Sequence, residues 1–170
     1  LSAFYHDVLK DRLYTTPAGS HARRSAQTAI HHVLEALVRW LAPVLSFTAD
    51  EVWRSMPGER AESVHLETYY ALPQPADAEA LRGQWTTLRA VRHAVDTALE
   101  PLRSAKTIGA SLDAAVTLYA DGELGGLLTD FGDELRFMLL TSDVTVRPAA
   151  DAPADAHRDA DTGVAVAVAV

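Results

Sequence analysis

The spacing of apolar residues along this 170-residue chain changes close to Ser111. Before that point, apolar side chains recur every three or four residues, which is the period of an amphipathic helix. After it come short apolar stretches, such as 114–120 and the alternating 164–170, that are typical of strands. A helical period does not suit a strand, so the two parts must fold differently. The sequence therefore predicts a mainly α protein, a helical bundle followed by a small α/β unit.

The first part of the chain predicts four helices. They are expected over residues 2–14, over 20–41, after Thr48, and over 78–104. Ser20 is expected to cap the second helix, and Thr48 with Glu51 forms a capping-box pattern for the third. The apolar face of the second helix contains Ala26, Ala29, Ile30, Val33, Leu37, Trp40, Leu41 and Val44. We expect Trp40 and Trp53 to pack in the core.

The second part predicts a small sheet with one covering helix. Strands are expected over residues 114–120, 143–147 and 164–170, and one helix over 122–142 despite its glycines. The Ala- and Asp-rich stretch 149–162 is expected to be a mobile loop.

Charge is distributed unevenly between two expected domains, residues 1–72 and 73–170. The boundary between them lies within the Pro-containing stretch 71–78, which is the expected linker. Residues 1–72 contain seven Lys or Arg and eight Asp or Glu, whereas residues 73–170 contain eight and fifteen. Most of the net charge of −8 therefore lies in the second domain. An anionic partner would meet the first domain more readily.

The sequence contains no motif for catalysis or metal binding. It lacks a P-loop, a GxGxxG stretch and an HExxH pair, and it has no cysteine. His31 and His32 are adjacent, so on a helix they point about 100° apart and cannot share a metal ion. Asp50 and Glu51 are accounted for by a helix start, where the helix dipole favours negative charge. We therefore predict no catalytic residue, no metal ligand and no cofactor in this chain.

Basic residues gather around the turn between the first two expected helices. They are Lys10, Arg12, Arg23 and Arg24. Two arginines in the first turn of a helix oppose its dipole by about a few tenths of a kcal/mol, which indicates a role beyond stability. Guanidinium groups match phosphate oxygens, so the interpretation is phosphate contact, and ordinary surface charge is the alternative.

A polar sector of the second helix extends this basic cluster. It contains Arg24, Gln27, Thr28, His31, Glu35 and Arg39. Arg23 points closer to the apolar side of the same helix. The predicted nucleic-acid-binding residues are Lys10, Arg12, Arg23, Arg24, Gln27 and His31.

Three segments, "FYHDVLKDRLYT", "SHARRSAQTAIHHVLEALVRWLAPVLSFTADEVW" and "AKTIGASLDAAVTLYA", occur in this order. Together with "GDELRFMLLTSDVTV" they resemble the C-terminal region of bacterial isoleucyl-tRNA synthetases, over about residues 1–147. The resemblance implies a helical anticodon-binding domain of the class I synthetase type, followed by a small α/β junction unit. It implies that isoleucine-accepting tRNA and the remainder of a parent synthetase are the partners, in the cytoplasm and away from membranes.

In that family, isoleucine activation with ATP and Mg²⁺ takes place far upstream of this region. The chain is therefore expected to be a fragment of an ATP-dependent isoleucine–tRNA ligase without the catalytic and editing sites. Many bacterial members continue into a cysteine-rich zinc module. This cysteine-free chain ends near the point where that module would begin.

Two other functions remain open. The chain could be the equivalent region of a valyl- or leucyl-tRNA synthetase, which changes the tRNA and not the mechanism. It could instead be a structural helical module that packs on another protein, with the basic cluster as a solvated surface. Added salt distinguishes tRNA binding from docking on a protein, because phosphate-driven binding weakens steeply with salt and apolar docking does not.

Overall fold

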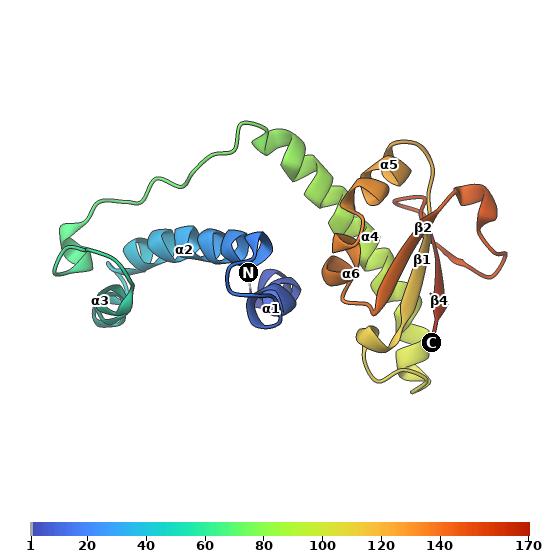
Figure 1. Ribbon diagram of the computed structural model, residues 1–170, viewed down its shortest axis with the longest axis horizontal. Helices are drawn as coiled ribbons and strands as arrows, with labels where there is room; N and C mark the ends of the chain where they lie inside the picture. Colours follow the sequence, from blue (N-terminus) through green and yellow to red (C-terminus); the bar gives the residue numbers. More distant parts are fainter. Residues whose placement is uncertain (1) are drawn as a thin grey trace. The chain divides into compact units, whose positions relative to one another are not determined.

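The computed structural model describes residues 2–170, which form two compact units (Figure 1). We call Leu9–Ala76 the helical unit. The α/β unit combines the residues up to Val8 with Asp77–Val170. Among the described residues, no helix combines the length and the apolar character needed to cross a bilayer.

The helical unit is built around its two longest helices and the corner between them. The π-helical turn at Ser2–His6 and the first two residues of α1 (Asp7–Tyr14) belong to the α/β unit. The helical unit contains the rest of α1, then α2 (His21–Leu41) and α3 (Ser46–Ser55). A 3-10 turn at Val64–Leu66 precedes an extended segment. Ser20 caps α2 as predicted, because its Oγ accepts a hydrogen bond from the backbone N–H of Arg23 at 3.2 Å.

The predicted N-cap of α3 is wrong. The helix begins at Ser46 rather than after Thr48, and the capping position is Leu45, which provides no side-chain cap. The reason is the tight corner after α2, where the N–H of Leu45 donates to the carbonyl of Leu41 at 2.7 Å. The N–H of Ala49 already donates to the carbonyl of Leu45 at 2.8 Å. Thr48 therefore lies inside the first turn of the helix.

The core of the helical unit confirms the prediction for Trp53 and contradicts it for Trp40. The core contains Val38, Ala42, Ala49, Trp53, Met56 and Val64. Trp53 is 1% exposed, whereas Trp40 is 50% exposed. Trp40 comes two residues after Val38, so it lies about 200° further around the helix, away from this core. Leu41 and Val44, also assigned to the apolar face, are exposed as well.

The α/β unit contains a long helix, a sheet and two short helices. The elements are α4 (Ala78–Ser104), β1 (Ala115–Tyr119), α5 (Gly122–Phe131), α6 (Glu134–Leu139), β2 (Asp143–Arg147), β3 (His157–Arg158) and β4 (Ala165–Ala169). Short 3-10 turns lie at Ser111–Asp113 and Ala149–Asp151. The predicted helix over 78–104 is confirmed, with Pro101 in its last turn.

The sheet has the strand order β2-β1-β4-β3. β1 runs parallel to β2 and antiparallel to β4, and Leu118 of β1 lies opposite Val146 and Val166. The three predicted strands are confirmed as members of one sheet. The stretch 149–162 also contains β3, which pairs with β4 through His157 opposite Val166.

The single helix predicted over 122–142 is wrong, because the chain forms α5 and α6 instead. Gly132 ends α5 with φ +48° and ψ −133°, a conformation that residues with a side chain rarely adopt. Leu140 ends α6 in the left-handed region at φ +57°. Apolar periodicity continues across this break, which is why the pattern did not reveal it.

The core of the α/β unit lies between α4, the short helices and the sheet. α4 contributes Leu88, Val91, Val95 and Leu99. The sheet contributes Val116, Leu118 and Val166 to the same core. The expected fold, a helical bundle followed by a small α/β unit, is confirmed.

Candidate nucleic-acid interface

The side chain of Arg23 is hydrogen-bonded within the protein. Its Nη1 donates a hydrogen bond to the backbone carbonyl of Thr16 at 3.1 Å, and the side chain is half-buried. Its backbone N–H donates to the cap residue Ser20. Arg23 therefore fastens the turn between α1 and α2, in line with its position close to the apolar side of the helix.

Arg24 differs from its neighbour in both exposure and contacts. Its side chain is exposed, and among residues 4–170 no hydrogen bond or ion pair involves its guanidinium group. Only its backbone is engaged, since its carbonyl accepts a hydrogen bond from the Thr28 hydroxyl at 2.8 Å. The positive charge of Arg24 is therefore available to a ligand.

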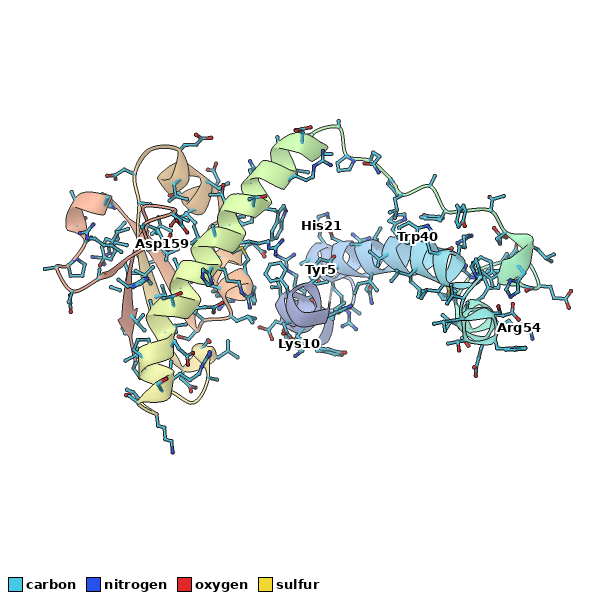
Figure 2. The ribbon with its side chains drawn as sticks, turned by 180° about the vertical axis from the view of Figure 1, so that it is seen from behind. Tyr5, Lys10, His21, Trp40, Arg54 and Asp159 are labelled. Carbon is cyan, nitrogen blue, oxygen red and sulfur yellow. The ribbon has the colours of Figure 1, made fainter. Side chains whose placement is uncertain are left out.

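The other predicted residues lie in different surroundings. Lys10 and Arg12 of α1 both take part in interactions within the protein; Lys10 is exposed and Arg12 half-buried. Gln27 is exposed on α2. His31 is half-buried, with its Nε2 3.5 Å from Oε1 of Glu35. Figure 2 shows Lys10 on α1 and His21 at the start of α2. Lys10 and Arg12 add positive potential, whereas Gln27 is uncharged. Among the predicted cations, only Arg24 combines exposure with an unengaged guanidinium group.

A groove of about 870 Å³ runs beside Arg24, and we call it the linker groove. One wall consists of His21, Arg24, Ser25, Thr28, Ala29 and His32 of α2, and the other of Pro73, Gln74 and Pro75. The α2 residues are three or four positions apart, so they form one stripe along the helix. None of the nine lining residues has a negative charge.

Sequence reasoning identified Arg24 and Thr28 but missed the rest of this groove. The spacing of His21, Ser25 and His32 was a usable signal, since these polar residues share a helix face with Arg24. The second wall had no local signal, because the stretch 71–78 was interpreted as a spacer. In the fold, its residues Pro73–Pro75 line the same groove as the first half of α2.

A buried ionic cluster is centred on Glu35 of α2, the helix that forms one wall of the groove. Glu35 is 5% exposed, and its carboxylate forms ion pairs with Arg39 and with Arg60, the latter at 2.6 Å. Arg39 also pairs with Glu67 at 3.2 Å. Because Arg60 and Glu67 lie beyond α3, these contacts fasten the segment after α3 onto α2.

The pKa of Glu35 is lowered by this cluster. Burial alone would raise it, but hydrogen bonds from Arg60 and Arg39, with the two positive charges, outweigh burial and bring it below the ordinary value of 4.5. The carboxylate is therefore charged when the protein is folded at neutral pH.

Aromatic rings connect the cluster to the groove. The guanidinium carbon of Arg39 lies 4.5 Å from the ring centroid of Trp53 and 5.3 Å from that of Tyr70. The Tyr70 hydroxyl is 2.7 Å from Nδ1 of His32, and the two rings stack with centroids 5.9 Å apart. The cluster thus positions Tyr70, and Tyr70 positions His32 in the groove wall.

Acidification is expected to weaken the helical unit through Glu35. Since folding lowers this pKa, the stabilisation is complete above the ordinary value of 4.5 and is lost as the pH falls through the lower folded value. Glu35→Gln cannot ionise, so its free energy of unfolding should fall less steeply than that of the unmodified protein between about pH 5 and pH 3. Denaturant unfolding at several pH values measures the difference. Parallel pH profiles for the two proteins would contradict it.

Asp50 also holds the segment after α3. Its Oδ1 accepts a hydrogen bond from the Ser63 hydroxyl at 2.6 Å and another from the backbone N–H of Val64 at 3.2 Å. The hydrogen bond from Ser63 is the main cause of its lowered pKa. The interpretation of Asp50 and Glu51 as residues of a helix start is wrong, because α3 begins at Ser46 and has no acidic residue in its first turn. The role of Asp50 is instead to anchor a loop. Among the described residues, no group of three or more His, Cys, Asp or Glu side chains is arranged to hold a metal ion.

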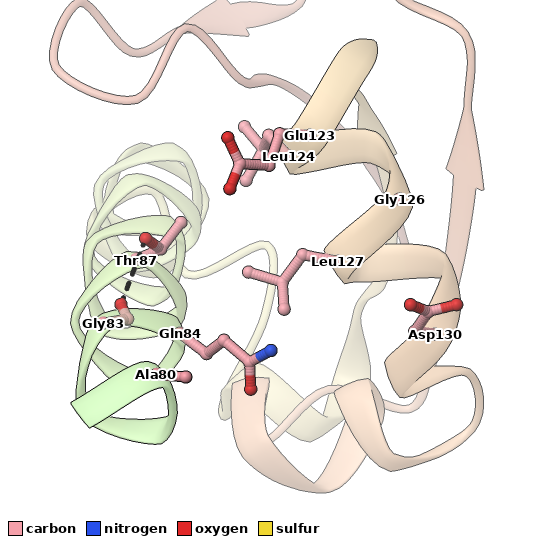
Figure 3. Close-up of a pocket in the computed structure, with 9 residues that line it drawn as sticks. All are labelled: Ala80, Gly83, Gln84, Thr87, Glu123, Leu124, Gly126, Leu127 and Asp130. Carbon is pink, nitrogen blue, oxygen red and sulfur yellow. Dashed lines mark hydrogen bonds between the residues drawn. The ribbon is translucent and has the colours of Figure 1, made fainter. Parts of the chain in front are cut away.

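A second groove, in the α/β unit, has the opposite character. It lies between α4 and α5, has a volume of about 830 Å³, and is lined in part by Glu123 and Asp130 (Figure 3). Figure 3 also shows Leu127 and Gln84 between these helices, with no basic residue among the nine drawn. Its carboxylates would repel phosphate, whereas the linker groove presents Arg24 without any carboxylate.

An unengaged arginine beside a groove without carboxylates is complementary to a phosphate-bearing partner. The chain belongs to the family of the anticodon-binding domain of tRNA ligase, whose family model matches residues 1–118. The family expected from the sequence is thereby confirmed.

Isoleucine–tRNA ligases are among the similar proteins. The chain is 56% identical over 158 residues to the isoleucine–tRNA ligase of Pseudomonas entomophila (strain L48). It is 54% identical over 157 residues to that of Halorhodospira halophila (strain DSM 244 / SL1). Each match covers 92% of this chain and 17% of the relative. The chain therefore spans about a sixth of the length of these relatives.

Proposed function

We propose that this domain binds the anticodon stem-loop of an isoleucine-accepting tRNA and positions that tRNA for aminoacylation. The chemistry, with its ATP and Mg²⁺, would take place in other parts of an isoleucine–tRNA ligase in the cytoplasm. The observation that carries this proposal is the exposed guanidinium group of Arg24 beside a groove that has no negative charge.

The basic residues would contribute unequally to tRNA binding. Arg24 would bind a phosphate directly, since its guanidinium group has no partner among the described residues. Lys10, Arg12 and Arg23 would add a positive field around the α1–α2 turn, and a field does not require unengaged side chains. Gln27 and His31 would add polar contacts. Such contacts to the RNA backbone position the tRNA, and the bases of its loop provide the specificity.

The similar proteins favour isoleucine tRNA over the valine or leucine alternatives, since the relatives reported above are isoleucine–tRNA ligases.

Packing on the remainder of a parent synthetase is compatible with tRNA binding and has separate support. Phe47 is 94% exposed at the corner between α2 and α3, beside the exposed Val44 and Leu45. Exposed apolar side chains of this kind favour a protein contact.

Arg24→Ala is expected to weaken binding of isoleucine tRNA by about fivefold to tenfold at low salt, and to reduce the slope of log affinity against log salt by about one unit. Arg23→Ala should reduce affinity less and should also destabilise the α1–α2 turn, because it removes the hydrogen bond to Thr16. The loss for Arg24→Ala should be similar for different anticodons, since phosphate contacts carry no sequence information.

Arg89→Ala provides the matched control, because Arg89 is exposed on α4 and has no side-chain partner among the described residues. Fluorescence anisotropy with labelled tRNA, at several salt concentrations, measures both the affinity and the slope. Equal behaviour of the Arg24 and Arg89 variants would argue against the proposed phosphate contact.

A further inference from the structure

The linker groove has two walls of different chemistry. The α2 wall offers the guanidinium group of Arg24, the imidazole of His21 and the Ser25 hydroxyl. The opposite wall is the extended segment Pro73–Pro75, whose two proline rings are rigid and apolar. Between them lies a space of about 870 Å³, within the ~300–1,000 Å³ range of sites that hold one small ligand.

One aromatic side chain of the groove is already oriented. His32 lines the groove, and its Nδ1 is 2.7 Å from the Tyr70 hydroxyl. The two rings stack at an interplanar angle of 28°, and Tyr70 in turn lies against the guanidinium group of Arg39. The imidazole therefore needs no rearrangement before it contacts a ligand, which favours binding.

We propose that the linker groove holds one unstacked nucleotide of a single-stranded RNA loop, an inference that rests on the proposed function. Its phosphate would lie on Arg24, and its base would lie between the His32 imidazole and the proline rings. Ser25 would be within reach of the ribose hydroxyl, and the exposed amide of Gln74 would meet the edge of the base. This assigns His32 and Gln74 to base binding, and Tyr70 to positioning His32.

The chemistry of the lining favours this occupant over others. A flat base needs ring faces and apolar contacts, which His32, Pro73 and Pro75 provide. The phosphate needs a cation without a competing carboxylate, and the linker groove fulfils this condition while the groove of Glu123 and Asp130 does not. A base paired within a duplex remains in its stack, so the nucleotide must come from a single-stranded loop.

The test combines protein variants with abasic RNA. The probe is the anticodon stem-loop of isoleucine tRNA, as an intact RNA and as a series with the base removed at one loop position at a time. We expect one position at which base removal weakens binding to the unmodified protein by about tenfold, because one stacked base contributes an effect of this order. Gln74→Ala should weaken binding of the intact RNA by about fivefold, and should add little to the loss from base removal at that same position.

Tyr70→Phe tests the positioning role. It removes the hydroxyl beside His32 and keeps the ring, so it should weaken binding of the intact RNA by about threefold. The loss should again disappear with the abasic RNA, and the slope of log affinity against log salt should be unchanged, because Arg24 is not affected. A merely structural role for Tyr70 would weaken the intact and abasic RNAs equally.

Gln84→Ala is the matched control, because Gln84 is an exposed glutamine of the α/β unit and lines the carboxylate-containing groove. It should leave all affinities unchanged. If the unmodified protein binds no stem-loop at all, the proposed function fails and this inference fails with it. If it binds in a salt-dependent way, but Gln74→Ala weakens intact and abasic RNAs equally at every position, the nucleotide groove alone is wrong.

Discussion

Glu35→Ala is expected to lower the free energy of unfolding of the helical unit by about 3–5 kcal/mol. The substitution removes the carboxylate that pairs with Arg39 and Arg60, whose side chains are 11% and 12% exposed. Arg60 would then lie in a poorly solvated site without its carboxylate partner, and Arg39 would keep only Glu67. The charge left uncompensated accounts for most of the loss. Denaturant unfolding followed by circular dichroism measures the change.

Glu67→Ala is the control for this result. Glu67 also pairs with Arg39, at 3.2 Å, but it lies at the exposed edge of the cluster. Removing an exposed partner should lower the free energy of unfolding by less than about 1 kcal/mol. If Glu35→Ala is no more destabilising than Glu67→Ala, the cluster does not hold the helical unit together as described.

Trp53→Ala is expected to have a similarly large effect, lowering the free energy of unfolding by about 3–5 kcal/mol. The indole fills the core between α2 and α3, and its Nε1 donates a hydrogen bond to the carbonyl of Ala61 at 2.9 Å. The guanidinium carbon of Arg60 lies 4.7 Å from its ring centroid, so the variant also removes a surface on which the ionic cluster packs.

Trp40→Ala tests whether burial, rather than the size of the side chain, explains that loss. Trp40 belongs to the same helical unit, near the end of α2 (Figure 2), and its side chain is half-exposed. Its removal should lower the free energy of unfolding by no more than about 1 kcal/mol. Equal destabilisation by the two tryptophan variants would contradict the assignment of the core.

Periodicity in the sequence was sufficient for the regular parts of the fold. The helices over 20–41 and 78–104 follow from apolar residues every three or four positions, and β4 follows from the alternation in 164–170. The break at Gly132 was not visible, because the apolar pattern continues from α5 into α6. Thr48 matched a capping box by spacing alone, whereas the corner after α2 decides where α3 begins.

The candidate site was predictable only where its residues lie on one helix. Arg24 and its polar sector follow from helical spacing, and the Glu35–Arg39 pair is four residues apart. Arg60 joins Glu35 across 25 residues, and Pro73–Pro75 approach α2 from still further along the chain. No local pattern encodes such approaches, since they depend on how the segment after α3 folds back.

The same contacts relate stability to binding in this domain. The ionic cluster holds Arg39, Arg39 lies against Tyr70, and Tyr70 holds His32 in the linker groove. A variant that loosens the cluster should therefore weaken RNA binding even though it touches no RNA. Comparisons of binding between variants consequently require that each variant is folded at the temperature of the assay.

Binding of this chain to isoleucine tRNA and to valine tRNA, at about 50 mM and 200 mM salt, tests the central claim most directly. Arg24 would bind one phosphate directly, and Lys10, Arg12 and Arg23 would add a positive field. The fourfold increase in salt should therefore weaken binding by about threefold or more for both tRNAs. At each salt concentration isoleucine tRNA should bind more tightly, by about fivefold or more, because its loop bases differ. Equal affinity for the two tRNAs, unchanged between the two salt concentrations, would contradict the account.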